Sequence, residues 1–158
     1  LRGNHLCFLL ILFYVSDVEV EGKGSSLTSQ GMSLVEWKRS FRAPVPELDA
    51  WSRSNLSSIC NWHGVTCDVR EKTISKLNLS GIVLIGTLRE FKFHTFADIT
   101  SITLDGTALG GTIPAAIGNL SKLGFLYLGD NFLVGEIPLE IWSLTELQEL
   151  DVSSNALH

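Results

Sequence analysis

Apolar residues return at a nearly constant interval over the second half of the chain. The ranges 74–98, 99–122 and 123–146 carry apolar residues at matching places, and 147–158 begins the same pattern again. Each range contains an apolar–polar–apolar alternation, which predicts a short strand. One such unit cannot bury its own apolar face, so neighbouring units must stack. The pattern therefore predicts a solenoid of short parallel strands.

The alternation also predicts which side chains face the core. An inward asparagine follows it at Asn131 and Asn155, where a side-chain amide can bond the backbone groups of the bend that no ladder satisfies. Thr107 could do part of this in its unit, and Ile82 could not. The expected inward apolar residues are Leu77, Leu79, Ile102, Leu104, Leu126, Leu128, Leu150 and Val152.

A second signal is the tetrapeptide Gly-x-Ile-Pro, which occurs at 111–114 and again at 135–138. We expect the glycines at Gly86, Gly111 and Gly135 to allow a turn that a Cβ would obstruct. The prolines fix φ and begin a return segment on the opposite side of the solenoid. In the first unit Leu88-Arg89 replaces Ile-Pro. Short helical or 3₁₀ turns are expected around Ile117, Leu120, Ile141 and Leu144, which are spaced to pack inward.

The region before the repeats has a different organisation. Residues 32–42 place apolar side chains at steps of three to four, which predicts an amphipathic helix that Pro44 and Pro46 stop. We expect the polar, Gly/Ser-rich stretch 16–31 to be flexible. The Ser-rich stretch 52–58 is predicted to be a loop.

An unbroken apolar run lies at 6–15, after Arg2 and before an acidic, polar stretch. It is too short to span a bilayer as a helix and has the length of the apolar core of a secretory signal peptide. A buried core helix is the alternative. We assign residues 1–24 to the signal and its flank and expect cleavage between Ser16 and Ser25.

Cysteine usage fits secretion. Cys7 lies within the apolar run and would leave with the signal, whereas Cys60 and Cys67 form an even pair that reads as a disulfide. A metal site is the weaker alternative, because only His63 lies between the two cysteines and zinc prefers four ligands. The triplet Asn-x-Ser/Thr occurs at Asn55, Asn78 and Asn119, which predicts glycosylation.

The composition of the chain argues against some classes of binding partner. The formal net charge is −5 with no basic block, which argues against nucleic acid and against a basic membrane-surface helix. No nucleophile–base pair, catalytic carboxylate pair or phosphate loop is visible, so we expect neither an enzyme nor a cofactor.

Together these residues resemble the plant-specific class of extracellular leucine-rich repeat proteins, with the pattern L-x-x-L-x-L-x-x-N-x-L-x-G-x-I-P-x-x-I-G-x-L. Residues 99–122 match it closely, and 123–146 match it even at Asn131. Residues 25–73 resemble the N-terminal cap of this class. The residues that carry this second resemblance are Leu34, Trp37, Leu48, Trp51, Cys60, Trp62, Gly64, Val65 and Cys67.

The resemblance implies an α/β solenoid: a right-handed superhelix with short parallel strands on its concave face and a helical, disulfide-bonded cap. It also implies the ectodomain of a plant receptor-like kinase or receptor-like protein at the cell surface. The partners would be an extracellular peptide or protein ligand and a co-receptor ectodomain. A secreted, wall-located protein similar to inhibitors of fungal polygalacturonases is the alternative.

The outward strand positions supply the candidate ligand-binding residues. Phe125 and Tyr127 are the unusual members, because aromatic side chains are enriched at recognition surfaces. An ordinary solvated face with two scattered aromatics is the alternative, as it is for the loosely acidic strip that includes Asp130 and Glu146. The candidates are Lys76, Ser101, Thr103, Asp105, Phe125, Tyr127, Glu149 and Asp151.

The repeat pattern stops within a fourth unit, at His158. We therefore expect an N-terminal fragment of a longer protein or a truncated gene model. Residues 1–158 expressed alone are expected to be poorly soluble or marginally stable, because repeat arrays need a terminal cap.

Overall fold

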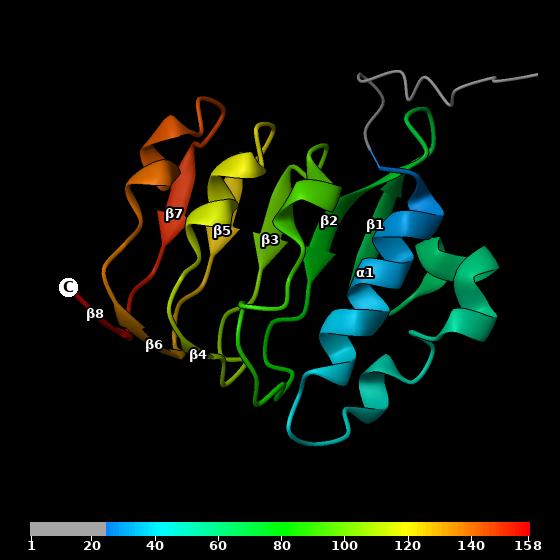
Figure 1. Ribbon diagram of the computed structural model, residues 1–158, viewed down its shortest axis with the longest axis horizontal. Coiled ribbons are helices and arrows are strands. Elements are labelled where there is room, and N and C mark those ends of the chain that lie inside the picture. The colour runs from blue at the N-terminus through cyan, green and yellow to red at the C-terminus, as the bar shows by residue number, and fades with distance from the viewer. Residues whose placement is uncertain (1–24) are drawn as a thin grey trace, which may run out of the picture.

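The computed structural model describes residues 25–158, and the predicted signal at 1–24 lies outside that range. The first helix, α1, spans Leu27–Arg39 (Figure 1). The prediction of a helix over 32–42 placed both ends too late, and the prediction of a flexible stretch up to residue 31 was wrong from Leu27 onward. The helix begins early because the Ser26 hydroxyl accepts the Ser29 N–H at 3.2 Å and caps the first turn.

The rest of the cap wraps around α1. Two 3₁₀ segments follow, η1 (Pro46–Leu48) and η2 (Arg53–Asn61), so the predicted Ser-rich loop over 52–58 is helical instead. Three buried tryptophans tie these segments together by donating their indole N–H groups to backbone carbonyls. The pairs are Trp37 with Thr87, Trp51 with His63, and Trp62 with Asn55.

A five-stranded sheet forms one face of the molecule. Its strand order is β1-β2-β3-β5-β7, with β1 antiparallel to β2 and all other pairs parallel (Figure 1). The antiparallel strand β1 was not predicted. The strands are β1 (Val65–Asp68), β2 (Thr73–Asn78), β3 (Ser101–Thr103), β5 (Phe125–Tyr127) and β7 (Glu149–Asp151).

A second, smaller parallel sheet runs along the lower edge in Figure 1, in the order β4-β6-β8. Gly111 and Gly135 are the last residues of the first two of these strands and have φ of 74° and 82°, a conformation that favours glycine, as predicted for the Gly-x-Ile-Pro positions. The strands are β4 (Gly110–Gly111), β6 (Phe132–Gly135) and β8 (Ala156–Leu157).

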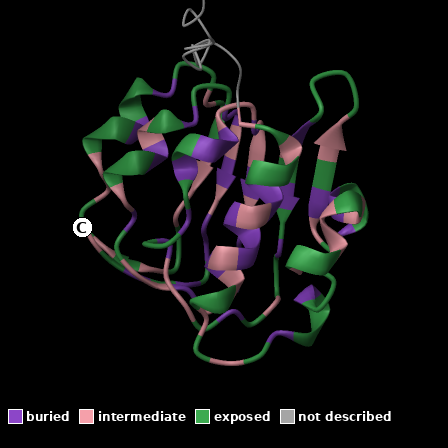
Figure 2. Cartoon of the chain, turned by 45° about the vertical axis from the view of Figure 1, so that its right-hand side comes forward, coloured by how far each residue is buried: buried purple, intermediate pink, exposed green. Residues whose placement is uncertain are grey.

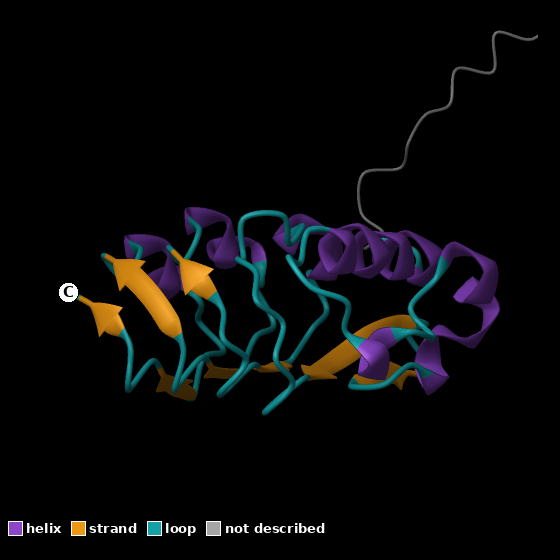
Figure 3. Ribbon diagram, turned by 90° about the horizontal axis from the view of Figure 1, so that it is seen from below, coloured by secondary structure: helices purple, strands orange, loops and turns teal. Residues whose placement is uncertain are grey.

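The return segments are 3₁₀ helices that lie with α1 along one long side of the molecule (Figure 3). They are η3 (Phe93–Phe96), η4 (Ala115–Asn119) and η5 (Leu139–Ser143). Pro114 and Pro138 occupy the N-cap positions of η4 and η5, which confirms their predicted role. Ile117, Leu120, Ile141 and Leu144 are buried beneath these turns.

The core lies between the sheet and the helical side (Figure 2). Six of the predicted inward residues, from Leu77 to Leu128, are buried, and Leu150 and Val152 are half-buried. The asparagine prediction is also confirmed. Asn131 Oδ1 accepts the backbone N–H groups of Thr107 and Leu109, and its Nδ2 donates to the Leu104 carbonyl at 2.7 Å.

The first unit departs from the others where Ile-Pro is missing. Gly86 is needed for close approach rather than for positive φ, because a Cβ there would lie 2.6 Å from the Phe41 ring. The left-handed conformation falls on Ile85 instead, with φ of 44°. This conformation is unusual for a β-branched residue and carries local strain.

Candidate ligand-binding surface

Seven of the eight candidate residues lie in two rows across the concave face of the five-stranded sheet, and Asp105 lies beyond the end of β3. Backbone register aligns Lys76, Ser101, Phe125 and Glu149 in the first row. The second row aligns Asn78, Thr103, Tyr127 and Asp151. The two aromatic side chains are half-buried and lie on the same face of β5, two residues apart.

The sheet does not bring all eight candidates together. Three strand spacings separate Lys76 on β2 from Glu149 on β7, which is about 14 Å at 4.8 Å per strand. The surface is therefore polarised, with the basic side chain near the cap and the carboxylates toward β7. A ligand that contacts both ends must be extended.

Tyr127 and Glu149 form a direct link between neighbouring strands. The Tyr127 hydroxyl donates a hydrogen bond to Glu149 Oε2. This bond to a carboxylate raises the pKa of Tyr127, with burial and the neighbouring negative charges acting in the same direction. The phenol therefore stays neutral and positioned at physiological pH.

Two carboxylates lie on either side of Gly129, just beyond the end of β5. A Cβ on Gly129 would lie 3.3 Å from Asp105 Oδ1 and 3.4 Å from Asp151 Oδ2. Asp105 Oδ1 accepts the Gly129 N–H at 2.8 Å, yet burial and then the charges of Asp151 and Asp130 raise the pKa of Asp105. Asp151 differs, because hydrogen bonds from the Ser153 side chain and backbone N–H lower its pKa.

The side chains of this surface are suited to hydrogen bonding and apolar contact with a ligand. Among residues 25–158, no group of three His, Cys, Asp or Glu side chains is placed to hold a metal ion. Over the same residues, no helix is both long enough and apolar enough to cross a membrane. The polar residues of both rows can donate and accept hydrogen bonds along an extended ligand, and Phe125 supplies an apolar contact within the first row.

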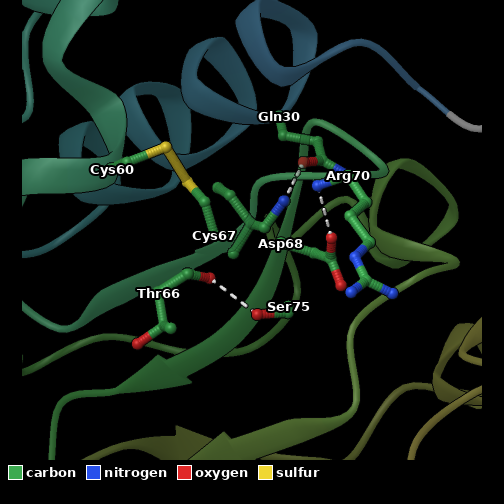
Figure 4. The surroundings of a disulfide bond; sticks show 8 residues. Gln30, Cys60, Thr66, Cys67, Asp68, Arg70 and Ser75 are labelled. Atoms are coloured by element: carbon green, nitrogen blue, oxygen red, sulfur yellow. Dashed lines mark hydrogen bonds between the residues drawn. A yellow bond between two sulfur atoms is a disulfide. The ribbon is translucent and has the colours of Figure 1, made fainter.

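The other sequence-predicted positions are spread over the molecule. Cys60 and Cys67 form the predicted disulfide, which joins the end of η2 to β1 (Figure 4). Asn78 and Asn119 are exposed. Asn55 is half-buried and donates its amide N–H to the Ala50 carbonyl at 2.9 Å, a bond that an attached glycan would have to displace.

Sequence reasoning missed one surface feature. Exposed apolar side chains lie along the edge that carries the second sheet, including Phe132 on β6 and Val83 in the first unit. The signal was present, since both residues hold the tenth place of their repeat, but no role was assigned to that place from the sequence.

Comparison with known proteins identifies the architecture. Residues 27–68 match the family described as leucine rich repeat N-terminal domain. The leucine-rich repeat receptor-like serine/threonine-protein kinase RGI4 of Arabidopsis thaliana is 32% identical over 141 residues, which are 89% of this chain and 13% of that protein. The chain therefore spans a small part of the length of this relative, in its repeat region and outside its kinase.

Two solved structures share the fold. The ectodomain of the plant membrane receptor kinase GASSHO1/SCHENGEN3 from Arabidopsis thaliana, crystallised with CASPARIAN STRIP INTEGRITY FACTOR 2, aligns with a TM-score of 0.70 and 30% identity. It covers 81% of this chain and 15% of that chain. The ectodomain of the Arabidopsis receptor kinase HAESA, in complex with an IDA peptide hormone ligand, aligns with a TM-score of 0.68 and 26% identity, over 84% and 22%.

These relatives are extracellular parts of plant receptors, which supports a secretory or extracellular location. The solved relatives share the solenoid fold with this chain, and its cap matches the N-terminal domain family. The chain belongs to the plant extracellular leucine-rich repeat family of receptor-like kinases and receptor-like proteins, of which it carries the N-terminal cap and first repeats.

Proposed function

We propose that this chain is the N-terminal part of a receptor ectodomain that binds an extracellular peptide or protein at the plasma membrane. In this proposal residues 25–73 cap the solenoid and 74–158 begin the repeats. The relatives with solved structures include a receptor kinase bound to a peptide hormone, which favours a receptor over a wall-located polygalacturonase inhibitor. A co-receptor ectodomain is the expected second partner.

The half-exposed pair Phe125 and Tyr127 is the observation that carries the proposal. Both side chains emerge from β5, with the polar residues of β3 on one side and those of β7 on the other. Aromatic side chains held by a rigid strand lose little entropy on binding and dominate interface energies. The proposed contact residues are Lys76, Ser101, Thr103, Asp105, Phe125, Tyr127, Glu149 and Asp151.

Glycosylation at the three sequons belongs to the same proposal. Asn78 stands on the concave face beside Lys76, so a glycan there would cover the cap end of the surface. The ligand would then contact mainly β3, β5 and β7, with Lys76 of β2 at the glycan-covered margin of the surface.

The test is binding of a synthetic library of secreted plant peptides to the immobilised full-length ectodomain. Phe125→Ala and Tyr127→Ala are expected to weaken a bound peptide at least about fivefold, as central aromatic contacts do. Trp142→Ala is the matched control, because Trp142 is an exposed aromatic on η5, outside the concave face. Peptides that bind all three variants equally would contradict the proposed surface. Inhibition of a fungal polygalacturonase by the purified protein would favour the alternative function.

A further inference from the structure

The edge of the molecule that carries the second sheet has a groove that the proposed receptor function does not use. This edge shows pairs of side chains from successive units, at the tenth and twelfth places of each repeat. The first unit contributes Val83 and Ile85, and the third contributes Phe132 and Val134; all four are apolar and exposed. The second unit contributes only Ala108 and Gly110 at the same places. Small residues between two apolar ridges leave a valley one repeat wide.

The valley is a formed cavity. It has a volume of about 460 Å³, with Val83 and Ile85 on one wall and Phe132 on the other. Gly110 lies at its floor, paired with Thr87 on one side and with Phe132 on the other. Two strand spacings separate the ridges, which is about 10 Å and admits one bulky side chain or one extended segment.

The walls are held in place by the backbone. Phe41 packs over Gly86, and the neighbouring Ile85 has the left-handed conformation. The Ile85 carbonyl accepts the Arg42 N–H at 3.1 Å, which anchors the cap to this ridge. The side chain of Phe132 is 71% exposed, so most of the ring lacks a packing partner within the chain. Exposed apolar patches of this kind mark contact sites.

Charge indicates what the groove accepts. Arg42 is the one charged residue among those that line the cavity, and its guanidinium forms no ion pair within residues 25–158. The chain as a whole is acidic, with a formal net charge of −5. A carboxylate approaching the molecule is therefore favoured at this groove, where an arginine stands alone beside apolar walls.

We propose that this groove docks a second protein through a bulky apolar side chain that lies next to a carboxylate. The apolar side chain fills the valley over Ala108 and Gly110, and the carboxylate pairs with Arg42. This contact is separate from ligand binding on the concave face, because the residues that line the groove lie outside the five-stranded sheet. The receptor could then hold a peptide and a protein partner at the same time.

The test uses three blocked peptides, Ac-Gly-Glu-Trp-Gly-NH2, Ac-Gly-Gln-Trp-Gly-NH2 and Ac-Gly-Glu-Ala-Gly-NH2, titrated against the full-length protein by ligand-observed NMR. The Glu-Trp peptide is expected to bind more tightly than either of the others. Phe132→Ser should weaken its binding at least about fivefold, as loss of an aromatic contact does. Arg42→Gln should weaken it about twofold to threefold, as expected for an exposed ion pair, and remove the preference for Glu over Gln.

Three further variants distinguish docking in the groove from loss of folding and from non-specific binding. Ala108→Asn fills the valley at a residue with φ of 58°, a conformation that asparagine tolerates, and should abolish peptide binding while the protein stays folded. Val69→Ser removes an apolar side chain that is 86% exposed and lies outside the groove, and should change nothing. Tyr127→Ala on the concave face should also leave the signal unchanged, so failure here is distinct from failure of the proposed peptide site.

Three outcomes would overturn the proposal: no binding of the Glu-Trp peptide, equal binding by the Ala108→Asn variant, or equal affinity for the Glu and Gln peptides. Sedimentation equilibrium tests whether a second copy of the protein occupies the groove instead. If the full-length protein self-associates and Phe132→Ser abolishes the association, then a second copy fills the groove and a separate protein partner is excluded.

Discussion

The side-chain oxygen of Gln30 accepts the backbone N–H of Ile74 at 2.7 Å in the interior of the cap (Figure 4). The same side chain donates from Nε2 to the Thr95 carbonyl at 3.0 Å. One fully buried amide thus joins α1 to the first repeat strand and to η3. It satisfies two backbone groups that the ladder leaves unpaired at the start of the repeats.

The first prediction is that Gln30→Met destabilises the protein by about 2–4 kcal/mol, because two buried backbone groups lose their partners while side-chain volume is kept. Urea unfolding measures the change, and hydrogen exchange should show faster exchange at the Ile74 amide. Thr28→Met, on the exposed side of α1, is the control and should cost less than about 0.5 kcal/mol. Equal stability of the two variants would mean that water replaces the Gln30 bonds.

The second prediction concerns the inward asparagine. Asn131 makes six hydrogen bonds with neighbouring residues of two units, including the Thr107 hydroxyl at 3.0 Å. Asn131→Ala is expected to cost about 3 kcal/mol or more, because several buried groups lose their partners together. Thr107→Val removes one hydroxyl from the same network and should cost about 1–2 kcal/mol. Thermal unfolding measures both, and a Thr107→Val cost that equals or exceeds that of Asn131→Ala would contradict the central position of the asparagine.

The third prediction is that the disulfide stabilises the cap modestly. The Cys60–Cys67 bond closes a short loop, with a sequence separation of 7. Loop-closure entropy for this length gives about 2.5 kcal/mol, which Cys60→Ser with Cys67→Ser should lose. Unfolding in urea with intrinsic tryptophan fluorescence follows the change, since Trp62 lies within the closed loop and Trp51 stacks on it. A loss below about 1 kcal/mol would indicate that η2 and β1 are held mainly by packing.

Much of the repeat region could be predicted from sequence, because each unit faces the same physical requirements. Inward residues such as Leu104 and Leu126 follow strand alternation, and Asn131 answers a need for backbone hydrogen bonds that recurs in each bend. Pro114 and Pro138 mark the return turns because proline restricts φ. Local chemistry repeated at a fixed interval is the most readable signal in the chain.

The cap was less predictable, because its buried positions are polar or small. The first turns of α1 bury Gln30 and Gly31, which apolar periodicity does not count, so the helix appeared to start later. The helical form of η2 depends on tertiary bonds such as that from Trp62 to the Asn55 carbonyl. The β1–β2 hairpin turns at Lys72 with φ of 54°, without the glycine that usually signals such a turn.

The sequence predicts which residues face the candidate surface. It does not predict the direction in which the pKa of each carboxyl group is shifted. Register placed Phe125 and Tyr127 on the concave face once the strands were known. The different surroundings of Asp105 and Asp151 could not be read from sequence, because they depend on burial and on the Ser153 and Gly129 backbone groups.

The fourth prediction follows from the raised pKa of Asp105. Its causes are burial first, and then repulsion by Asp151 and Asp130, which together outweigh the hydrogen bond from Gly129. A carboxyl with a higher pKa in the folded state binds protons more readily there than in the unfolded chain. Its contribution to the free energy of unfolding is therefore most favourable below the unfolded pKa, and is lost as pH rises through the folded pKa.

Asp105→Asn should consequently stabilise the protein at neutral pH, because the amide oxygen can still accept the Gly129 N–H while the unfavourable charge is removed. The gain should shrink as pH falls toward the model-peptide range of aspartate, about 3.9, where the native carboxyl is also neutral. Unfolding midpoints of both proteins between pH 3 and pH 8 test this. Asp151→Asn provides the opposite case, since hydrogen bonds from Ser153 lower the pKa of Asp151 and its ionised form is favoured in the fold. That variant should lose stability at neutral pH, and a gain for both variants would mean that overall negative charge, rather than the local surroundings of each carboxylate, governs the stability of this surface.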